Sequence, residues 1–296
     1  MRTAVMTVAL KMDELYGEPP ALVHPVVWMG HALAWLETHA PHSAAARLGY
    51  GCAVSLGLPA AWGCLAGLVE RCAPWPVQAL LLKPTFAGRA LLAAARRVED
   101  ALDAGRLGEA RQELRSLVSR PTAELDDQLA SAAAIESLAE NLVDSWVAPL
   151  ASYALFGLGG AYAYRAANTA DAMWGYHTPR YEWLGKAAAR LDDVLNWAPA
   201  RLGTLLLVLS ADRRRAALTA WWRDAGRTAS PNAGQAMACV AGALDVRLEK
   251  RGHYLLNRTA RLPGPGDIAQ ARRLVRRAMV LAAVAAGVLG GARQRV

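Results

Sequence analysis

Charged residues are missing from two long stretches of this chain. No charged side chain occurs from Leu48 to Val69 or from Ser145 to Tyr164. Each run is long enough to cross a hydrocarbon core of about 30 Å, so both are predicted to be membrane-spanning helices. Two further apolar runs are Asp193–Asp212, with Arg201 inside it, and Arg277–Arg293, which is short for a span. Both are predicted to be tilted, broken or half-inserted helices.

The alternative for these runs is the core of a large soluble helical protein. Composition permits it, because hydrophobic residues make up 54% of the chain and mean hydropathy is only +0.14. Two separate charge-free runs of spanning length are uncommon in soluble cores, however, and this favours the membrane. The apolar run Val77–Leu82 is too short to cross unaided.

The fold class predicted for the whole chain is all-α, a polytopic integral membrane protein with amphipathic helices outside the bilayer. Helix-forming residues dominate and alternating β-branched runs are nearly absent. Over residues 86–129 an apolar stripe runs through charged surroundings, which predicts two amphipathic helices with a turn at Gly105–Gly108. No Pro-rich or Gly/Ser-rich linker divides residues 1–296, so a single helical membrane domain is expected.

The net charge of +8 is concentrated in one segment. Residues 212–277 contain fourteen Arg or Lys against five Asp or Glu. Basic residues that flank membrane spans stay in the cytoplasm, so this segment is predicted to be a basic cytoplasmic loop. It carries no nucleic-acid recognition motif and little aromatic interleaving, so no nucleic-acid partner is expected. The N-terminus has no small-residue cleavage site, and a removable signal peptide is not expected.

Three carboxylates at four-residue spacing are the strongest chemical signal. Glu136, Glu140 and Asp144 would form one stripe of a helix, with Asn141 beside it, where that helix enters an uncharged run. Like charges so placed repel each other, and the cost rises near lipid. Magnesium, an arginine or a cationic substrate would each compensate them. The alternative is a solvated charged face without a function.

Further polar clusters lie at the ends of the apolar runs. They occupy residues 13–30, 164–176, 190–201 and 230–234, and they combine acids, arginines and amides. Sites for phosphorylated substrates commonly combine carboxylates that bind Mg²⁺ with arginines that bind phosphate. The chain contains no G-x-x-x-x-G-K-[ST] motif and no G-x-S-x-G motif. The residues themselves therefore predict a membrane enzyme that handles phosphate with a divalent metal.

The same segments resemble a known family. The strings AAIESLAENLVDSWVAPL, YRAANTADAMWGYHTPRYEWLGKAAARLDDVLNWAPARL and SPNAGQAMACVAGAL, with the N-terminal DELYGEPPALVHPVVWMG, are similar to the CbiB/CobD family, the adenosylcobinamide-phosphate synthases of cobalamin biosynthesis. One departure is Arg120-Pro121-Thr122, where the family usually has Arg-Asp-Thr, and it puts a role for residue 121 in doubt.

The resemblance implies a multi-pass protein of the cell inner membrane. It implies a ligase that joins adenosylcobyric acid to aminopropanol phosphate, or to ethanolamine phosphate, through an amide bond, with ATP as co-substrate and Mg²⁺ as cofactor. The implied partners are this corrinoid, the amino-alcohol phosphate and membrane lipid, with other cobalamin-pathway enzymes as further candidates.

Resemblance and residue chemistry together assign candidate roles. Metal or amine handling is assigned to the acids, with Glu140, Asp144 and Asp192 as metal ligands, and phosphate or substrate binding is assigned to the basic and amide side chains. The catalytic candidates are Glu136, Glu140, Asp144, Asp171, Asp192 and Asp193, and the substrate-binding candidates are Asn141, Arg165, Asn168, Lys186, Arg190, Arg201, Ser230 and Asn232. Interhelical ion pairing is the alternative for each charged member.

Three rival functions stay open from the sequence. A Mg²⁺-dependent membrane prenyl- or alcohol-phosphate transferase would use the same acid-rich helix ends on a lipid diphosphate. An AmpE-like non-catalytic regulatory membrane protein would keep the fold without the site, but this chain retains ENLVD, NTAD, RLDD and SPNAG. A corrinoid-binding scaffold would bind the corrin without turnover.

Overall fold

The computed structural model describes residues 1–292 and is all-α, as the sequence predicts. The only strands in that range are β1 (Leu248–Lys250) and β2 (Tyr254–Leu256), which pair as a short antiparallel hairpin. The chain divides into two compact units, each assembled from separate stretches of sequence. Unit 1 comprises residues 1–87, 148–196 and those from Val284 onward, and unit 2 comprises residues 88–147 and 197–283. The single domain expected from the sequence stays a prediction, since compactness alone does not separate one domain from two.

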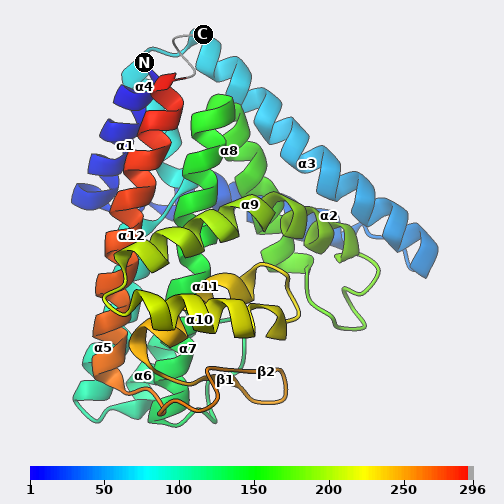
Figure 1. Cartoon of the computed structure of the whole chain (residues 1–296). Coiled ribbons are helices and arrows are strands. Elements are labelled where there is room, and N and C mark those ends of the chain that lie inside the picture. The colour runs from blue at the N-terminus through cyan, green and yellow to red at the C-terminus, as the bar shows by residue number, and fades with distance from the viewer. Residues whose placement is uncertain (293–296) are drawn as a thin grey trace. The chain divides into compact units, whose positions relative to one another are not determined.

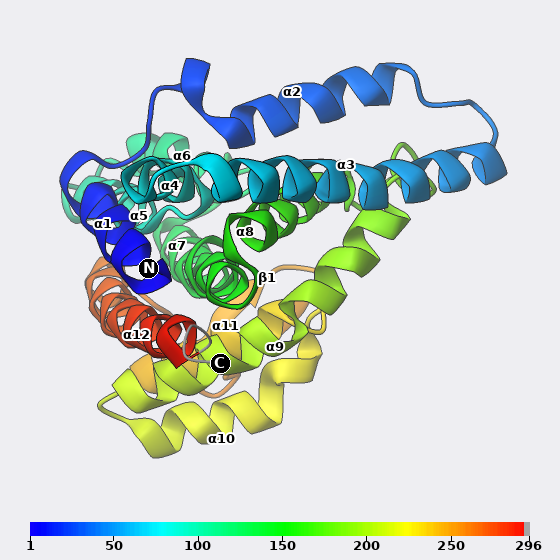
Figure 2. The same ribbon diagram turned by 90° about the horizontal axis from the view of Figure 1, so that it is seen from above.

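Unit 1 is organised around two long helices that pack along each other. They are α3 (Ala44–Cys72) and α8 (Ala148–Trp174), which Figure 2 shows side by side. Glycine allows their backbones to approach, because a Cβ on Gly159 would lie 2.9 Å from the carbonyl oxygen of Gly63. The other elements of this unit are α1 (Arg2–Tyr16), the 3₁₀ turns η1 (Ala21–Val23) and η2 (Lys83–Thr85), α2 (Pro25–Thr38), α4 (Trp75–Leu82), the start of α9 (Lys186–Ser210) and the end of α12 (Pro265–Ala292).

Helix α8 is interrupted at Gly157, whose φ of 73° and ψ of −159° are not helical. The break frees backbone groups that a helix would pair, and a charged pair satisfies them. Arg2 Nη1 donates to the carbonyl oxygens of Ala154 and Leu155 at 3.3 and 3.4 Å, and Glu70 Oε2 accepts from the N–H of Leu158 at 2.8 Å. Each charge lies at the half-helix end whose dipole it complements.

Unit 2 is built around α7 (Asp127–Leu142), which is buried on nearly every side from Leu129 to Ala139. Helix α11 (Ala233–Leu244) is also largely buried, and α10 (Arg214–Asp224) lies beside it (Figure 1). The remaining elements are α5 (Gly88–Asp103), α6 (Leu107–Leu114), the π-helix η3 (Val143–Val147), the 3₁₀ turn η4 (Ala225–Arg227), the rest of α9 and most of α12.

The amphipathic pair expected over residues 86–129 is present as α5 and α6. Helix α5 buries one stripe that includes Leu91, Val98 and Leu102, and its charged residues lie elsewhere on its surface. The turn after it uses Gly105 at a φ of 69°, a left-handed conformation that glycine adopts without a steric penalty.

Three segments are long and apolar enough to cross a membrane, so membrane character is supported by the structure. They are Ala44–Cys72, Asp127–Trp174 and Pro265–Gly291. The first contains the predicted span Leu48–Val69. The second contains the predicted span Ser145–Tyr164, but it carries the break at Gly157 and is 67% buried in its most apolar window, against 22% for α3. Helix α3 therefore presents most of its apolar surface to its surroundings.

The run Arg277–Arg293 is part of a longer helix, so the expectation that it is short for a span was wrong. Helix α12 begins at Pro265 and is continuous for 28 residues, so the four arginines before the apolar run are part of the same helix. Long arginine side chains can extend from such a helix toward water while their stems stay on apolar surface. Arg293 itself lies outside the described residues. The run after Asp193 lies in α9, which contains Pro199 and is not among the three long apolar segments.

Candidate active site

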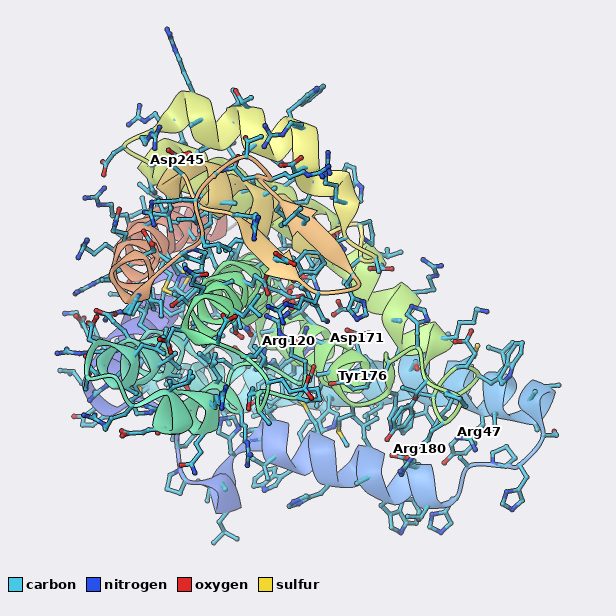
Figure 3. The ribbon with its side chains drawn as sticks, turned by 90° about the horizontal axis from the view of Figure 1, so that it is seen from below. Arg47, Arg120, Asp171, Tyr176, Arg180 and Asp245 are labelled. Atoms are coloured by element: carbon cyan, nitrogen blue, oxygen red, sulfur yellow. The ribbon has the colours of Figure 1, made fainter. Side chains whose placement is uncertain are left out.

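An ion pair in unit 2 holds the first acid of the predicted stripe. Glu136 Oε2 accepts from Arg120 Nη2 at 2.8 Å, and the two side chains are only 6% and 16% exposed. Burial, and then the charges of Glu136 and Glu140, raise the pKa of Tyr254 above its usual range, so its hydroxyl stays protonated. Arg120, Glu136, Glu140 and Tyr254 are called the acid cluster below. Figure 3 labels Arg120 among the side chains of this unit.

The stripe is not the regular one that was predicted. Residues Val143–Val147 form a π-helix, so Asp144 does not follow Glu140 at α-helical spacing. Asn141 is bound by near neighbours in the sequence: its Nδ2 donates to Ser137 O of the same helix at 3.0 Å, and its Oδ1 accepts from Ser145 Oγ of the π-helix at 3.2 Å. The widened turn therefore re-aims Asp144, and single-turn π-helices of this kind are frequent at functional sites.

A chain of polar side chains in unit 1 joins α8 to the start of α9. Asp192 accepts from Asn168 Nδ2 at 3.2 Å and from Asn196 Nδ2 at 2.9 Å. Tyr164 donates to Asn196 Oδ1 at 2.9 Å, and Arg165 Nη1 donates to Asn168 Oδ1 at 3.2 Å. These five residues are called the amide cluster.

Asp192 at the centre of the amide cluster has a perturbed acidity. Burial raises its pKa above the usual range for aspartate, and hydrogen bonds from Asn196 and Asn168 oppose that rise. A carboxyl group with a raised pKa is suited to accept a proton from a substrate, since its conjugate acid is then less strongly acidic.

Arg201 in unit 2 is pre-oriented as an anion binder. Its guanidinium stacks 4.3 Å from the ring centroid of Trp197, and its Nη1 donates to Trp197 O at 2.8 Å and to Asn232 Oδ1 at 3.3 Å. Ser230 Oγ accepts from the backbone N–H of Asn232 at 3.2 Å, which fixes the turn before α11. A planar guanidinium held in this way can offer its other N–H groups to phosphate.

Two of the predicted phosphate binders lie on the exposed face of α9. Arg190 is 76% exposed and forms an ion pair with Asp193 at 3.4 Å. Lys186 is 48% exposed, lies 3.8 Å from Glu182 and stacks over Trp183. Exposed pairs at this spacing are ordinary features of a helix surface and contribute little.

Asp171 lies at the end of α8 in unit 1. Its side chain lies close to Gly175, where an added Cβ would meet Asp171 Oδ1, and its backbone oxygen accepts from the N–H of Gly175 at 2.7 Å. Figure 3 shows Asp171 near Tyr176, which follows the helix. Its catalytic role stays a prediction.

Comparison with known proteins identifies the family. The family model described as CobD/Cbib protein matches residues 6–282. The chain belongs to this family. The cobalamin biosynthesis protein CobD of Dehalococcoides mccartyi is 41% identical over 269 residues, 85% of both chains. The cobalamin biosynthesis protein CbiB of Salmonella typhimurium is 37% identical over 276 residues, 88% of this chain and 86% of that one. No solved structure matches the chain.

The CobD/CbiB resemblance noted in the sequence is thereby confirmed, and a role in cobalamin biosynthesis implies a corrinoid substrate. The departure at Arg120-Pro121-Thr122 also has a structural meaning. Arg120 reaches Glu136, and Thr122 Oγ1 donates to Arg111 O at 2.8 Å, while Pro121 is exposed. Both neighbours of residue 121 are engaged, so a change at 121 leaves the acid cluster intact.

The metal ligands predicted for this CobD/CbiB chain do not form a preassembled group. Among residues 1–292, no three His, Cys, Asp or Glu side chains are arranged to hold a metal ion. Glu140 and Asp144 belong to unit 2 and Asp192 to unit 1. Magnesium at phosphate-handling sites is usually held by one or two carboxylates together with the substrate's phosphates, so the donor types of Glu140 and Asp144 fit it. Their metal role stays a prediction.

The structure also brings in residues that sequence reasoning missed. Arg120, Tyr164, Asn196 and Tyr254 each complete one of the two clusters. Asn196 could have been predicted as a partner of Asp192 from the sequence, because it lies one helical turn after Asp192. The other long-range partners follow from the folded chain and not from spacing.

Proposed function

We propose that this CobD/CbiB protein is an adenosylcobinamide-phosphate synthase that joins the free carboxylate of adenosylcobyric acid to the amine of aminopropanol phosphate or ethanolamine phosphate. The observation that carries the proposal is family membership over nearly the whole chain, with 41% identity to a relative named as a cobalamin biosynthesis protein. The carboxylates of the acid and amide clusters and the guanidinium of Arg201 are of the chemical types that such a reaction would use.

The reaction needs activation of the acid. A carboxylate does not react with an amine in neutral water, so we propose that ATP phosphorylates it and releases ADP. The amine then attacks the acyl phosphate, the new C–N bond replaces the C–O bond to phosphate, and inorganic phosphate leaves. Bound Mg²⁺ would neutralise charge on the phosphates during this transfer.

We assign three tasks to residues of this chain. Arg201, oriented by Trp197 and Asn232, would bind the phosphate of the amino alcohol. Asp192 would accept the proton that the ammonium group loses before it attacks, as its raised pKa suits. Glu140 and Asp144 would face the metal-bound phosphates.

Product formation tests the proposal. Purified protein is incubated with adenosylcobyric acid, the amine phosphate and Mg-ATP, and the corrinoids are analysed by mass spectrometry. We expect a corrinoid whose mass equals that of the two substrates joined with loss of water, with one ADP formed per product. Isoprenoid diphosphate in place of the corrinoid should give no product. Turnover of the isoprenoid instead would favour the transferase alternative.

A further inference from the structure

Unit 1 contains a cavity of about 610 Å³ to which the proposed function assigns no role. Its walls come from α1, α2, α3, α4, the second half of α8 and the opening loop, and Figure 2 shows the first four of these helices. The lining is apolar over most of its surface and includes Trp28, Trp62, Leu65, Val69 and Tyr162. A cavity of this size with few polar groups is typical of a small-molecule site.

One charged network lies at the polar end of the cavity. Lys83 is 4% exposed, and its Nζ lies 2.7 Å from Glu18 Oε1, 3.1 Å from Asp13 Oδ1 and 3.4 Å from Phe86 O. The ammonium group donates hydrogen bonds to Glu18 and Phe86 and forms an ion pair with Asp13, so two carboxylates surround its single positive charge. The charge of Lys83 is therefore offset by Asp13 and Glu18, although its side chain lines the cavity.

The histidine of the opening loop is engaged in the same way. His24 Nδ1 accepts from the N–H of Val26 at 3.2 Å, so Nε2 carries the hydrogen and donates to Glu18 Oε2 at 3.0 Å. Burial raises the pKa of Glu18, but hydrogen bonds from His24 and Lys83 outweigh burial and hold that pKa below its usual range. Glu18 is thus a carboxylate at neutral pH, and its side chain is 27% exposed.

These features restrict the chemistry of an occupant. An anionic phosphate would be repelled, because Asp13 and Glu18 place two carboxylates beside the one ammonium group of Lys83. A corrinoid carries many amide groups, and the apolar walls would leave them unpaired. A hydrocarbon chain suits the walls, and a group that donates N–H suits Glu18.

Part of the cavity lining is exposed on a helix that is long and apolar enough to cross a membrane. Helix α3 is one of the spanning segments, and two of its lining side chains, Leu65 and Val69, are 55% and 37% exposed. Leu80 of α4 lines the cavity too and is 58% exposed. An acyl chain can therefore enter sideways from the bilayer.

We propose that this cavity binds one acyl chain of an ethanolamine phospholipid, whose ammonium group donates to Glu18. The site takes no part in amide formation, so a negative result for lipid binding would not bear on the proposed enzyme activity, and the reverse also holds.

Native mass spectrometry of the full-length protein in detergent tests the head group. Three phospholipids with identical chains are compared, with ethanolamine, choline or glycerol heads. The ethanolamine lipid should bind roughly tenfold more tightly than the choline lipid, because the quaternary ammonium of choline has no N–H to donate. Equal binding of these two lipids, or preference for the anionic glycerol lipid, would overturn the proposal.

Matched variants test the location. Ala66→Trp places an indole in the cavity, and Ala61→Trp places one at an exposed position on the same helix that does not line it. We expect the first to reduce binding of the ethanolamine lipid at least tenfold, because the indole fills the space of the acyl chain, and the second to leave binding unchanged. Leu80→Trp gives the same loss from an exposed position, where the fold tolerates a larger side chain. Full binding in both Ala66→Trp and Leu80→Trp would place the lipid elsewhere and refute the site.

Discussion

The break in α8 gives a stability prediction that can be worked from the structure. Gly157 has a φ of 73° and a ψ of −159°, a region in which side-chain-bearing residues are strained by about 1–3 kcal/mol. A Cβ at this position would also lie 2.3 Å from Glu70 Oε2. Gly157→Ala must therefore move the carboxylate that accepts from the N–H of Leu158.

Displacing Glu70 removes a charge-assisted hydrogen bond, which is worth about 1.5–3 kcal/mol. With the backbone strain, the free energy of unfolding should fall by about 2.5–6 kcal/mol. For a unit of this size the unfolding midpoint should drop by on the order of 10 °C. The measurement is a thermal scan of tryptophan fluorescence on the purified protein in detergent.

Gly57→Ala is the matched control in the same unit. Gly57 lies within α3, and an added Cβ there meets no atom within 4 Å. Its unfolding midpoint should stay the same or rise slightly, because alanine favours a helix by about 0.5–1 kcal/mol over glycine. Glu70→Gln, which keeps an acceptor but loses the charge, should give an intermediate drop. A wild-type midpoint for Gly157→Ala would show that α8 does not depend on this break.

Three further predictions concern the site. Asp144→Asn and Glu140→Gln should each lower turnover by on the order of hundreds-fold while the protein stays folded, and near-normal rates in both would make the acids structural. Arg201→Lys should raise KM for the amino-alcohol phosphate about tenfold and leave corrinoid affinity unchanged, because an ammonium lacks the planar fork. Arg190→Lys, at an exposed position, is its control and should match wild type; a larger effect at Arg190 would reverse the assignment. Finally, the raised pKa of Asp192 means that the folded state holds this proton more firmly than the unfolded state. Its contribution to stability is therefore present at low pH and declines as pH rises above the ordinary range for aspartate, and Asp192→Asn should flatten that part of a urea-unfolding profile against pH. An unchanged slope would mean that Asp192 titrates normally.

The parts of the fold that could be predicted are those set by local composition. The charge-free run from Leu48 to Val69 became α3, and the charged stripe over residues 86–129 became α5 and α6. Helix α12 was predicted too short. Arginines beside an apolar run suggest the end of a helix, but the arginines before this run lie inside α12, which begins at Pro265. The break at Gly157 could not be read from the sequence, since neighbouring Gly159 and Gly160 stay helical.

The same division applies to the site. Sequence patterns found Asn168 and Asp192, because each belongs to a compact polar motif, and the structure joins them. They did not find the partner of Glu136, because Arg120 lies sixteen residues earlier in a connecting segment. The π-helix at Asp144 was missed as well, since periodicity assumes a regular helix. Tertiary partners and local helix irregularity thus mark the limit of prediction from spacing.

The most direct test is the mass of the corrinoid formed by the purified protein from adenosylcobyric acid, aminopropanol phosphate and Mg-ATP. We predict a product heavier than the starting corrinoid by the amine phosphate less one water, formed together with ADP and lost in Asp144→Asn. Unchanged corrinoid in a protein that binds the corrinoid and remains folded would contradict the assignment of this chain as an amide-forming synthase.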